Sequence, residues 1–233
     1  MTSASGKTVL EVKQLNRPKA ERVNLVAALP DMGNVGALAA EFLVDHLRIE
    51  PFVEISSYDK PFVLCKDGLI SEVQSMFRLY YSERASLVVM TGNSQPNNPK
   101  ELYELCERVL DLAAAVGRLE RVYTCGGYHR EKIVGEPRVY GVSNNPELFK
   151  ELDKLGIREI GPEVSSITWF NGVILGVARR RKIDAVGLYG ELTDPAIPQP
   201  DAARAVLRAL TTLLSLPQIE KRERGEEGQA VGI

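Results

Sequence analysis

The chain contains few of the residues that build metal centres and nucleophilic active sites. Its 233 residues include only two histidines and three cysteines. These five side chains are scattered along the sequence without the spacing of a metal site, so we expect no bound metal. Three widely separated cysteines also make a disulfide framework unexpected, and they favour a reducing compartment.

The chain also lacks an excess of charge and any long apolar run. Its formal net charge is −2, so no general attraction to nucleic acid or to an anionic membrane is expected. No apolar run is long enough to span a bilayer, and residues 1–6 lack the apolar core of a signal peptide. We therefore expect a soluble cytoplasmic protein that binds neither nucleic acid nor membrane.

What the chain does have is an apolar run that ends in glycines and opens into a helical pattern. Residues 25–29 are apolar, Gly33 and Gly36 form a Gly-x-x-Gly turn, and residues 37–43 are rich in Ala and Leu. A strand followed directly by a helix begins in this way, so the segment predicts a layered α/β domain. Hydrophobic residues make up 44% of the chain, which is enough for a substantial core.

Patterning along the rest of the chain predicts one α/β domain between two polar ends. We expect an N-terminal arm at 1–20, with an edge strand at 9–12, a single domain at 21–217, and a flexible charged tail at 218–233. Strands are predicted at 23–29, 52–55, 77–81, 87–90, 122–124, 138–142 and 185–189, and a hairpin around Lys66-Asp67-Gly68. Helices are predicted at 35–47, 98–117, 145–156 and 200–214, and another is expected to follow Asn171-Gly172 and finish at 179–182. The middle segment has no long helix, so antiparallel strands are expected beside a mostly parallel sheet.

The glycine turn has two interpretations, phosphate binding and strand-to-helix packing. A helix N-terminus stabilises a nearby anion by about 0.3–1 kcal/mol, whereas micromolar binding requires about 8 kcal/mol. The turn lacks the third glycine of a dinucleotide site and the lysine of a P-loop. No Lys or Arg follows before Arg48, and the neighbouring Asp31 repels phosphate. Packing is therefore the favoured interpretation, and no cofactor is expected.

Polar and glycine residues at predicted strand ends define a candidate cleft, because ligands of open α/β sheets bind beyond the carboxyl ends of parallel strands. The cleft would comprise Asp31, Gly33, Asn34, Gly36, Gly92, Asn93, Gly126, Gly127 and Glu191. Cys125 and His129 could form a nucleophile and base, but no orienting acid is evident, and a cysteine near a strand end is more often buried packing. We expect no catalytic residue.

Several segments together resemble one family. They are Pro30-Asp31-Met32-Gly33-Asn34-Val35-Gly36, Lys66-Asp67-Gly68, Gly92-Asn93-Ser94-Gln95-Pro96, Gly126-Gly127-Tyr128, Asn171-Gly172, Gly190-Glu191-Leu192-Thr193 and Pro200-Asp201-Ala202-Ala203. In order and spacing they resemble the proteasome assembly chaperones, specifically the archaeal and bacterial relatives of the second eukaryotic member. The resemblance implies a three-layer α/β/α sandwich with a mixed, mostly parallel sheet, similar to purine nucleoside phosphorylases.

The same resemblance implies self-association and binding to α subunits of the 20S proteasome or to a paralogous chaperone. Some relatives carry names of the ATP-grasp ligase superfamily, but fold-level likeness does not confer that chemistry. Family tails that dock between α subunits end in a hydrophobic residue, a tyrosine and any residue. The matching positions here are Val231, Gly232 and Ile233, so the tyrosine is missing.

The leading hypothesis is therefore a non-enzymatic chaperone that binds proteins through a self-associated domain, with the tail as an auxiliary contact. One alternative is a small-molecule or nucleoside-binding protein, or an enzyme, that uses the candidate cleft. A further alternative is a structural oligomer whose partner is unrelated to proteasomes.

Overall fold

The computed structural model describes residues 10–58, 60 and 62–217. The strands are β1 (Glu11–Gln14), β2 (Arg22–Ala27), β3 (Pro51–Ser57), β4 (Val63–Lys66), β5 (Leu69–Glu72), β6 (Ser75–Ser82), β7 (Leu87–Gly92), β8 (Arg118–His129), β9 (Val139–Ser143), β10 (Arg158–Glu159) and β11 (Asp184–Leu192). The helices are α1 (Val35–Leu47), α2 (Pro99–Val116), α3 (Pro146–Lys154), α4 (Trp169–Arg180) and α5 (Pro200–Leu213), and a short 3-10 turn, η1 (Met32–Asn34), precedes α1.

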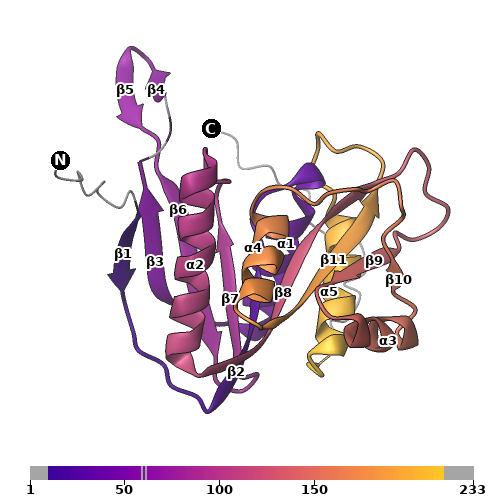
Figure 1. Cartoon of the computed structure of the whole chain (residues 1–233). Coiled ribbons are helices and arrows are strands. Elements are labelled where there is room, and N and C mark those ends of the chain that lie inside the picture. The colour runs from indigo at the N-terminus through magenta and orange to yellow at the C-terminus, as the bar shows by residue number, and fades with distance from the viewer. Residues whose placement is uncertain (1–9, 59, 61, 218–233) are drawn as a thin grey trace, which may run out of the picture.

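A nine-stranded mixed sheet forms the middle layer (Figure 1), in the order β1-β3-β6-β7-β2-β8-β11-β9-β10. The central strands β7, β2, β8 and β11 run parallel to one another. Antiparallel strands extend the sheet on both sides, through β6, β3 and β1 at one edge and β9 at the other. The predicted combination of a parallel centre with added antiparallel strands is thus confirmed.

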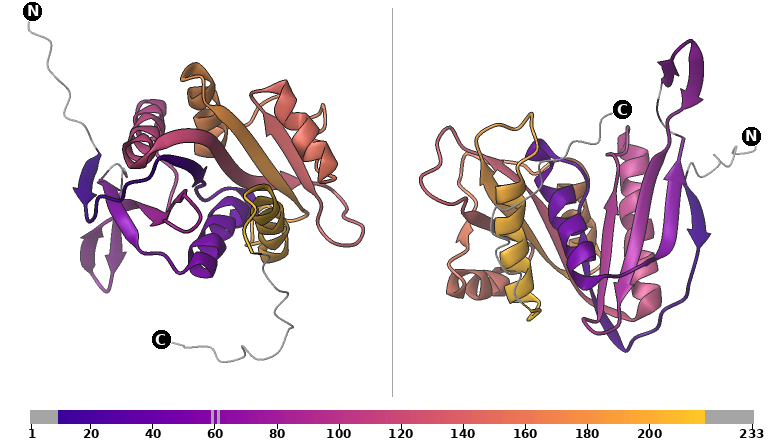
Figure 2. Two further views of the ribbon diagram at one scale, coloured as in Figure 1. Left: turned by 90° about the horizontal axis from the view of Figure 1, so that it is seen from below. Right: turned by 180° about the vertical axis from the view of Figure 1, so that it is seen from behind.

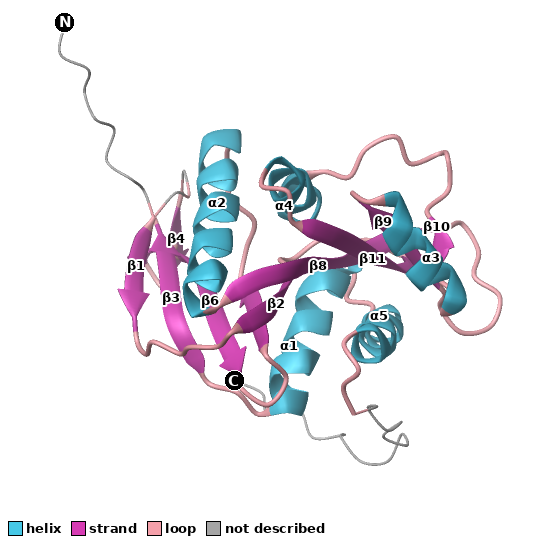
Figure 3. Ribbon diagram, turned by 60° about the horizontal axis from the view of Figure 1, so that its bottom comes forward, coloured by secondary structure: helices cyan, strands magenta, loops and turns pink. Residues whose placement is uncertain are grey.

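Helices cover both faces of this sheet (Figure 3), with α2 and α4 on one side and α1 and α5 on the other. Leu105 and Val109 of α2 and Ile174 of α4 belong to one buried cluster. Leu43 of α1 and Val206 of α5 belong to the second, which α3 also joins. The sheet is therefore apolar on both faces, and the expected three-layer α/β/α sandwich is confirmed.

Local sequence signals explain where the main elements begin. The apolar run of β7, Leu87–Met90, is fully buried, as expected for a parallel strand covered on both faces. Asn98 caps α2, because its side-chain oxygen accepts a hydrogen bond from the backbone N–H of Glu101 at 3.0 Å. Pro99 occupies the first turn, where a missing N–H removes no helical bond.

Two predicted boundaries were wrong. The strand expected to end before Gly126-Gly127 continues through both glycines to His129 and pairs with β11 over its whole second half. The glycines serve a close packing contact, since a Cβ at Gly127 would lie only 2.6 Å from the carbonyl oxygen of Met32. Helix α4 begins at Trp169, so Asn171 lies inside its first turn rather than before it.

The predicted hairpin is confirmed and forms a separate two-stranded sheet, β4–β5. Asp67 and Gly68 join the strands with φ of +53° and +78°, as a two-residue type I′ turn requires. Every residue of both strands is exposed, and the hairpin extends beyond the edge of the sandwich in all three views (Figures 1 and 2). Among the described residues, no helix combines the length and apolar character needed to cross a membrane.

Candidate functional site

The glycine turn after β2 brings the start of α1 against the sheet. Gly33 and Asn34 adopt φ of +63° and +53°, the left-handed region in which glycine carries no penalty. Gly36 lies in the first turn of α1, where a Cβ would stand 2.5 Å from the carbonyl oxygen of Cys125 on β8. A backbone oxygen cannot move aside as a flexible side chain can. The helix can therefore approach β8 this closely only at a glycine.

Asp31 links this turn to β8 through its carboxylate. Oδ1 accepts a hydrogen bond from the backbone N–H of Gly36 at 2.8 Å, and Oδ2 accepts one from Gly127 at 2.6 Å. Burial raises the pKa of Asp31 from 3.8 to about 6, although both hydrogen bonds favour the ionised form. The N–H of Gly36, which a bound phosphate would use, is thus already paired with a carboxylate.

Two side-chain amides hold the loop between β2 and the glycine turn. Asn171 of α4 accepts a hydrogen bond from the N–H of Leu29 at 2.9 Å and donates one to the carbonyl of the same residue at 3.0 Å. Gln95, in the loop after β7, donates to the carbonyl of Pro30 at 2.8 Å and accepts from the N–H of Phe170 at 3.2 Å. Both amides use their polar atoms on backbone groups, so they fasten this loop to α4 and to the end of β7.

A cavity of about 350 Å³ opens between this loop and the start of α4. Of the predicted cleft residues, Asp31 and Gly127 line it. Aromatic rings from three elements complete its wall, those of Tyr128, Trp169 and Tyr189. Burial raises the pKa of Tyr189, so its hydroxyl stays neutral. The cavity is large enough for a small organic molecule, and its wall combines two carboxyl groups, those of Asp31 and Glu163, with apolar surface.

An ion pair holds the segment before α4 at the mouth of this cavity. The hydroxyl of Tyr128 donates to Glu163, and the guanidinium of Arg130 donates to the same carboxylate at 2.8 Å. The guanidinium also lies 5.4 Å from the ring centre of Tyr128. Both charged side chains are half-exposed, so the pair positions the segment without adding much stability.

Gly92, Asn93 and Glu191 lie apart from this cavity. The Asn93 side chain accepts from a backbone N–H at the start of β6 at 2.8 Å and donates to the carbonyl just before that strand at 3.1 Å. Glu191 is buried, and it accepts from the N–H of Arg138 and the hydroxyl of Tyr140, each at 3.0 Å. The nine residues of the predicted cleft are thus divided among the glycine turn, the end of β7 with the residue after it, the second half of β8, and β11.

Cys125 and His129 do not form a nucleophile–base pair. Its side chain is fully buried, and burial raises the pKa of its thiol. His129 lies four residues further along the same extended strand, which places it about 13 Å away. Across residues 10–58, 60 and 62–217, no three His, Cys, Asp or Glu side chains gather into a potential metal site.

The chain is similar to known proteins in both sequence and fold. The chain is 33% identical over 214 residues to the uncharacterised protein MJ1210 of Methanocaldococcus jannaschii, covering 89% of this chain and 81% of the relative. Among solved structures, it resembles Pyrococcus furiosus PbaB, described as an archaeal proteasome activator. The TM-score is 0.77 and the identity 27%, over 90% of this chain and 91% of PbaB.

A second Pyrococcus furiosus protein, PbaA, is described as an archaeal homologue of proteasome-assembly chaperone. It has the same fold, with a TM-score of 0.72 at 23% identity over 89% of this chain and 87% of PbaA. The sequence profile of the PAC2 family matches residues 25–227, from the strand before the glycine turn into the C-terminal segment. The chain therefore belongs to the PAC2 family of proteasome-assembly-chaperone-like proteins, as its motifs predict.

Proposed function

We propose that this chain is a non-enzymatic chaperone-like protein that binds α subunits of the proteasome, alone or together with a paralogous chaperone. The observation that carries the proposal is the similarity to PbaB, which extends over nine-tenths of both chains. The site geometry supports it. Asp31, Gln95 and Asn171 hold the main chain in place with the same polar atoms that a reaction would need.

Reconstitution with purified subunits tests this function. The full chain is mixed with recombinant proteasome α subunits, and complexes are measured by native mass spectrometry and size-exclusion chromatography with light scattering. We expect a complex with α subunits and none with β subunits, which serve as the control. Absence of any complex with α subunits, both with and without a paralogous chaperone, would refute the proposal.

The C-terminal residues Val231, Gly232 and Ile233 lie outside the described residues, and we propose them as an auxiliary contact. If the tail docks like those of relatives with a penultimate tyrosine, Gly232→Tyr should tighten binding to α subunits, while the matched Gly232→Ala should leave it unchanged. Equal affinities for the two variants would remove the tail from the proposal without affecting the rest of it.

A second candidate function is small-molecule binding in the cavity of about 350 Å³ beside Asp31 and Trp169. A ligand that occupies the site at a hundred times its Kd would stabilise the fold by about 2.7 kcal/mol. A thermal-shift panel of nucleosides and nucleotides measures this directly. Stabilisation that is lost in Trp169→Ala would favour this candidate, and no stabilisation by any compound would favour the chaperone function.

A further inference from the structure

The β4–β5 hairpin exposes apolar side chains on both of its faces. Leu64 and Leu69 belong to one face, because the register pairs Leu64 with Ser71 and Lys66 with Leu69. Ile70 lies on the other face, paired with Cys65. The exposed fractions of Leu64, Leu69 and Ile70 are 55%, 76% and 75%. A hairpin that rests on its own domain has one covered face, whereas this one leaves both faces in solvent.

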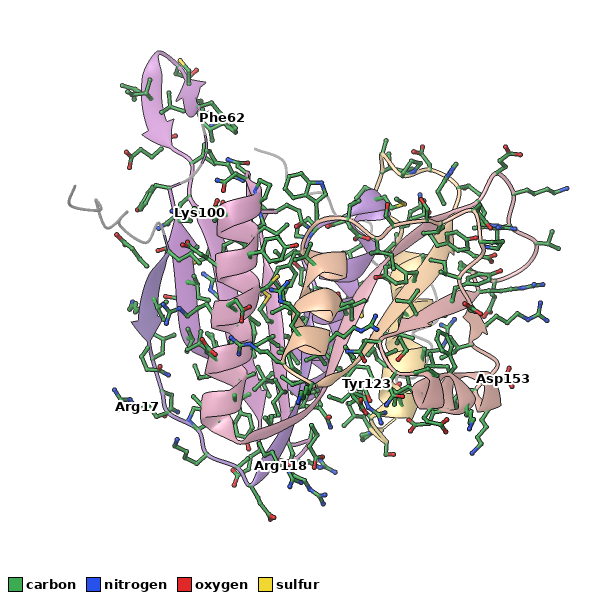
Figure 4. All side chains as sticks on the ribbon, in the orientation of Figure 1. Arg17, Phe62, Lys100, Arg118, Tyr123 and Asp153 are labelled. Carbon is green, nitrogen blue, oxygen red and sulfur yellow. The ribbon has the colours of Figure 1, made fainter. Side chains whose placement is uncertain are left out.

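The hairpin also lacks support from the rest of the fold. It forms its own two-stranded sheet, and neither strand joins the nine-stranded sheet. Phe62, at the base of β4, marks where the hairpin leaves the sandwich (Figure 4), and its side chain is 54% exposed. Isolated two-stranded hairpins are marginally stable in water, and contiguous exposed apolar surface marks an interaction site. A cavity that accepts the hairpin covers both faces at once, whereas a flat surface covers only one.

The opposite edge of the molecule contains a suitable cavity, which we call the arginine cavity. It measures about 490 Å³ and lies between β9, β10 and α5. Its apolar wall includes Val139, Leu155 and Ile157. Three arginines also line it, namely Arg138, Arg158 and Arg208. The only carboxylate that forms an ion pair with these arginines in the described part of the chain is Glu136, at 3.5 Å from Arg208.

The hairpin and the arginine cavity are complementary in apolar character and in charge. The hairpin presents apolar side chains together with two carboxylates, Asp67 at its tip and Glu72 at the end of β5, against one cation, Lys66. The cavity presents apolar side chains together with three cations. Complementary charges of this kind favour the correct partner and suppress wrong ones.

The two features cannot meet within one molecule. The hairpin connects β3 and β6, whereas the cavity borders β9 and β10. Five strand steps separate β6 from β9 in the sheet, which corresponds to about 24 Å. Figure 1 shows the two regions on opposite sides of the sandwich. Contact therefore requires a second molecule.

We propose that the β4–β5 hairpin of one copy of this chain inserts into the arginine cavity of the next copy. The contact joins two different surfaces of the same molecule, so it is heterologous, and its repetition closes a ring or extends a filament. This assembly does not rest on the proposed binding of α subunits. Either property can be lost in experiments while the other remains.

Single substitutions in the full chain test each half of the contact by size-exclusion chromatography with light scattering. Leu64→Asp should reduce the wild-type assembly to monomers, and Ile197→Asp is its matched control, since Ile197 is exposed to 54% on a different loop. Arg208→Glu should likewise yield monomers. Its matched control is Arg204→Glu, one turn earlier on α5 and outside the cavity. Both controls should assemble like the wild type, and circular dichroism verifies that every variant is folded.

Mixing the two monomeric variants distinguishes this contact from a symmetric one. Leu64→Asp retains its cavity and Arg208→Glu retains its hairpin, so an equimolar mixture should form a heterodimer of one copy of each and stop there. A mixture that stays monomeric overturns the proposal. A wild-type chain that is monomeric at about 100 μM, a concentration at which micromolar contacts form, also overturns it. Assembly of Leu64→Asp at the wild-type size also overturns it.

A synthetic peptide of residues 218–233 tests a different occupant of the cavity. If the peptide binds the wild type but not Arg208→Glu and the assembly nevertheless keeps its wild-type size, no hairpin occupies the cavity and the proposal is wrong. If the peptide does not bind, or if its binding dissociates the assembly, the hairpin remains the occupant.

Discussion

Removing the amide of Asn171 should strongly destabilise the fold, because it pairs both backbone polar groups of the buried Leu29. Asn171→Leu keeps the branched shape of the side chain and deletes only its polar atoms. The backbone N–H and carbonyl of Leu29 would then both lose their partners, in a residue with no solvent exposure. An unpaired buried backbone group costs about 1–3 kcal/mol, so the expected loss is about 2–6 kcal/mol. For a chain of this length, that lowers the Tm by roughly 4–24 °C.

Urea denaturation followed by circular dichroism measures this loss, and Asn171→Asp sharpens the test. The aspartate keeps an acceptor for the N–H of Leu29 but places a second oxygen against the Leu29 carbonyl. Its protonated form can donate there, so the folded state raises its pKa above the unfolded value. The variant should approach wild-type stability below about pH 4 and lose it as the pH rises through the folded pKa. A loss of less than about 1 kcal/mol in Asn171→Leu would refute the reasoning.

Three further predictions concern Asp31, Gly127 on β8 and the cap of α2. The rise in the pKa of Asp31 from 3.8 to about 6 corresponds to about 3 kcal/mol. A carboxyl group whose pKa is raised by folding contributes this stability in full at a pH below its pKa in the unfolded state. The contribution is lost as the pH rises through its pKa in the folded state. The free energy of unfolding of the wild type, relative to Asp31→Asn, should therefore fall between about pH 4 and pH 7, and a flat difference would contradict the burial argument. Gly127→Ala should cost about 1–3 kcal/mol in urea denaturation, because the new Cβ would lie 2.6 Å from the Met32 carbonyl. The control Gly176→Ala on α4 meets nothing within 4 Å and should be neutral or stabilising. Asn98→Ala should lower the unfolding free energy by about 1 kcal/mol through loss of the α2 cap, and an unchanged Tm would show that the cap contributes nothing.

Much of the fold could be predicted because its signals are local. Asn98 and Pro99 together predict the start of α2. Asp67-Gly68 predicts a hairpin turn because both residues readily adopt positive φ. Apolar runs such as Leu87–Met90 identify central strands without any knowledge of their neighbours. Strand order and the length of β8 depend on contacts between distant segments, so the sequence did not reveal them. The likeness to purine nucleoside phosphorylases stays a prediction.

The site was harder to predict, because its residues meet only through tertiary contacts. Asp31 and Gly127 are 96 positions apart and Leu29 and Asn171 are 142 apart, yet each pair shares a hydrogen bond. Glycines were interpreted as turns, but Gly127 is a strand residue that makes room for another backbone. Side-chain amides that form hydrogen bonds with the backbone, such as that of Asn171, produce no recognisable sequence pattern. The only signal in the sequence is an isolated polar residue in an otherwise apolar helical segment.

One of the three cysteines, Cys65, gives the protein a natural attachment point for thiol reagents. Cys106 and Cys125 are buried, and burial raises the pKa of both thiols, whereas Cys65 is exposed on β4. A maleimide dye should therefore label the hairpin in the folded wild-type chain, with no need to engineer a cysteine. The rate of that labelling would report, in real time, whether the hairpin is free or enclosed.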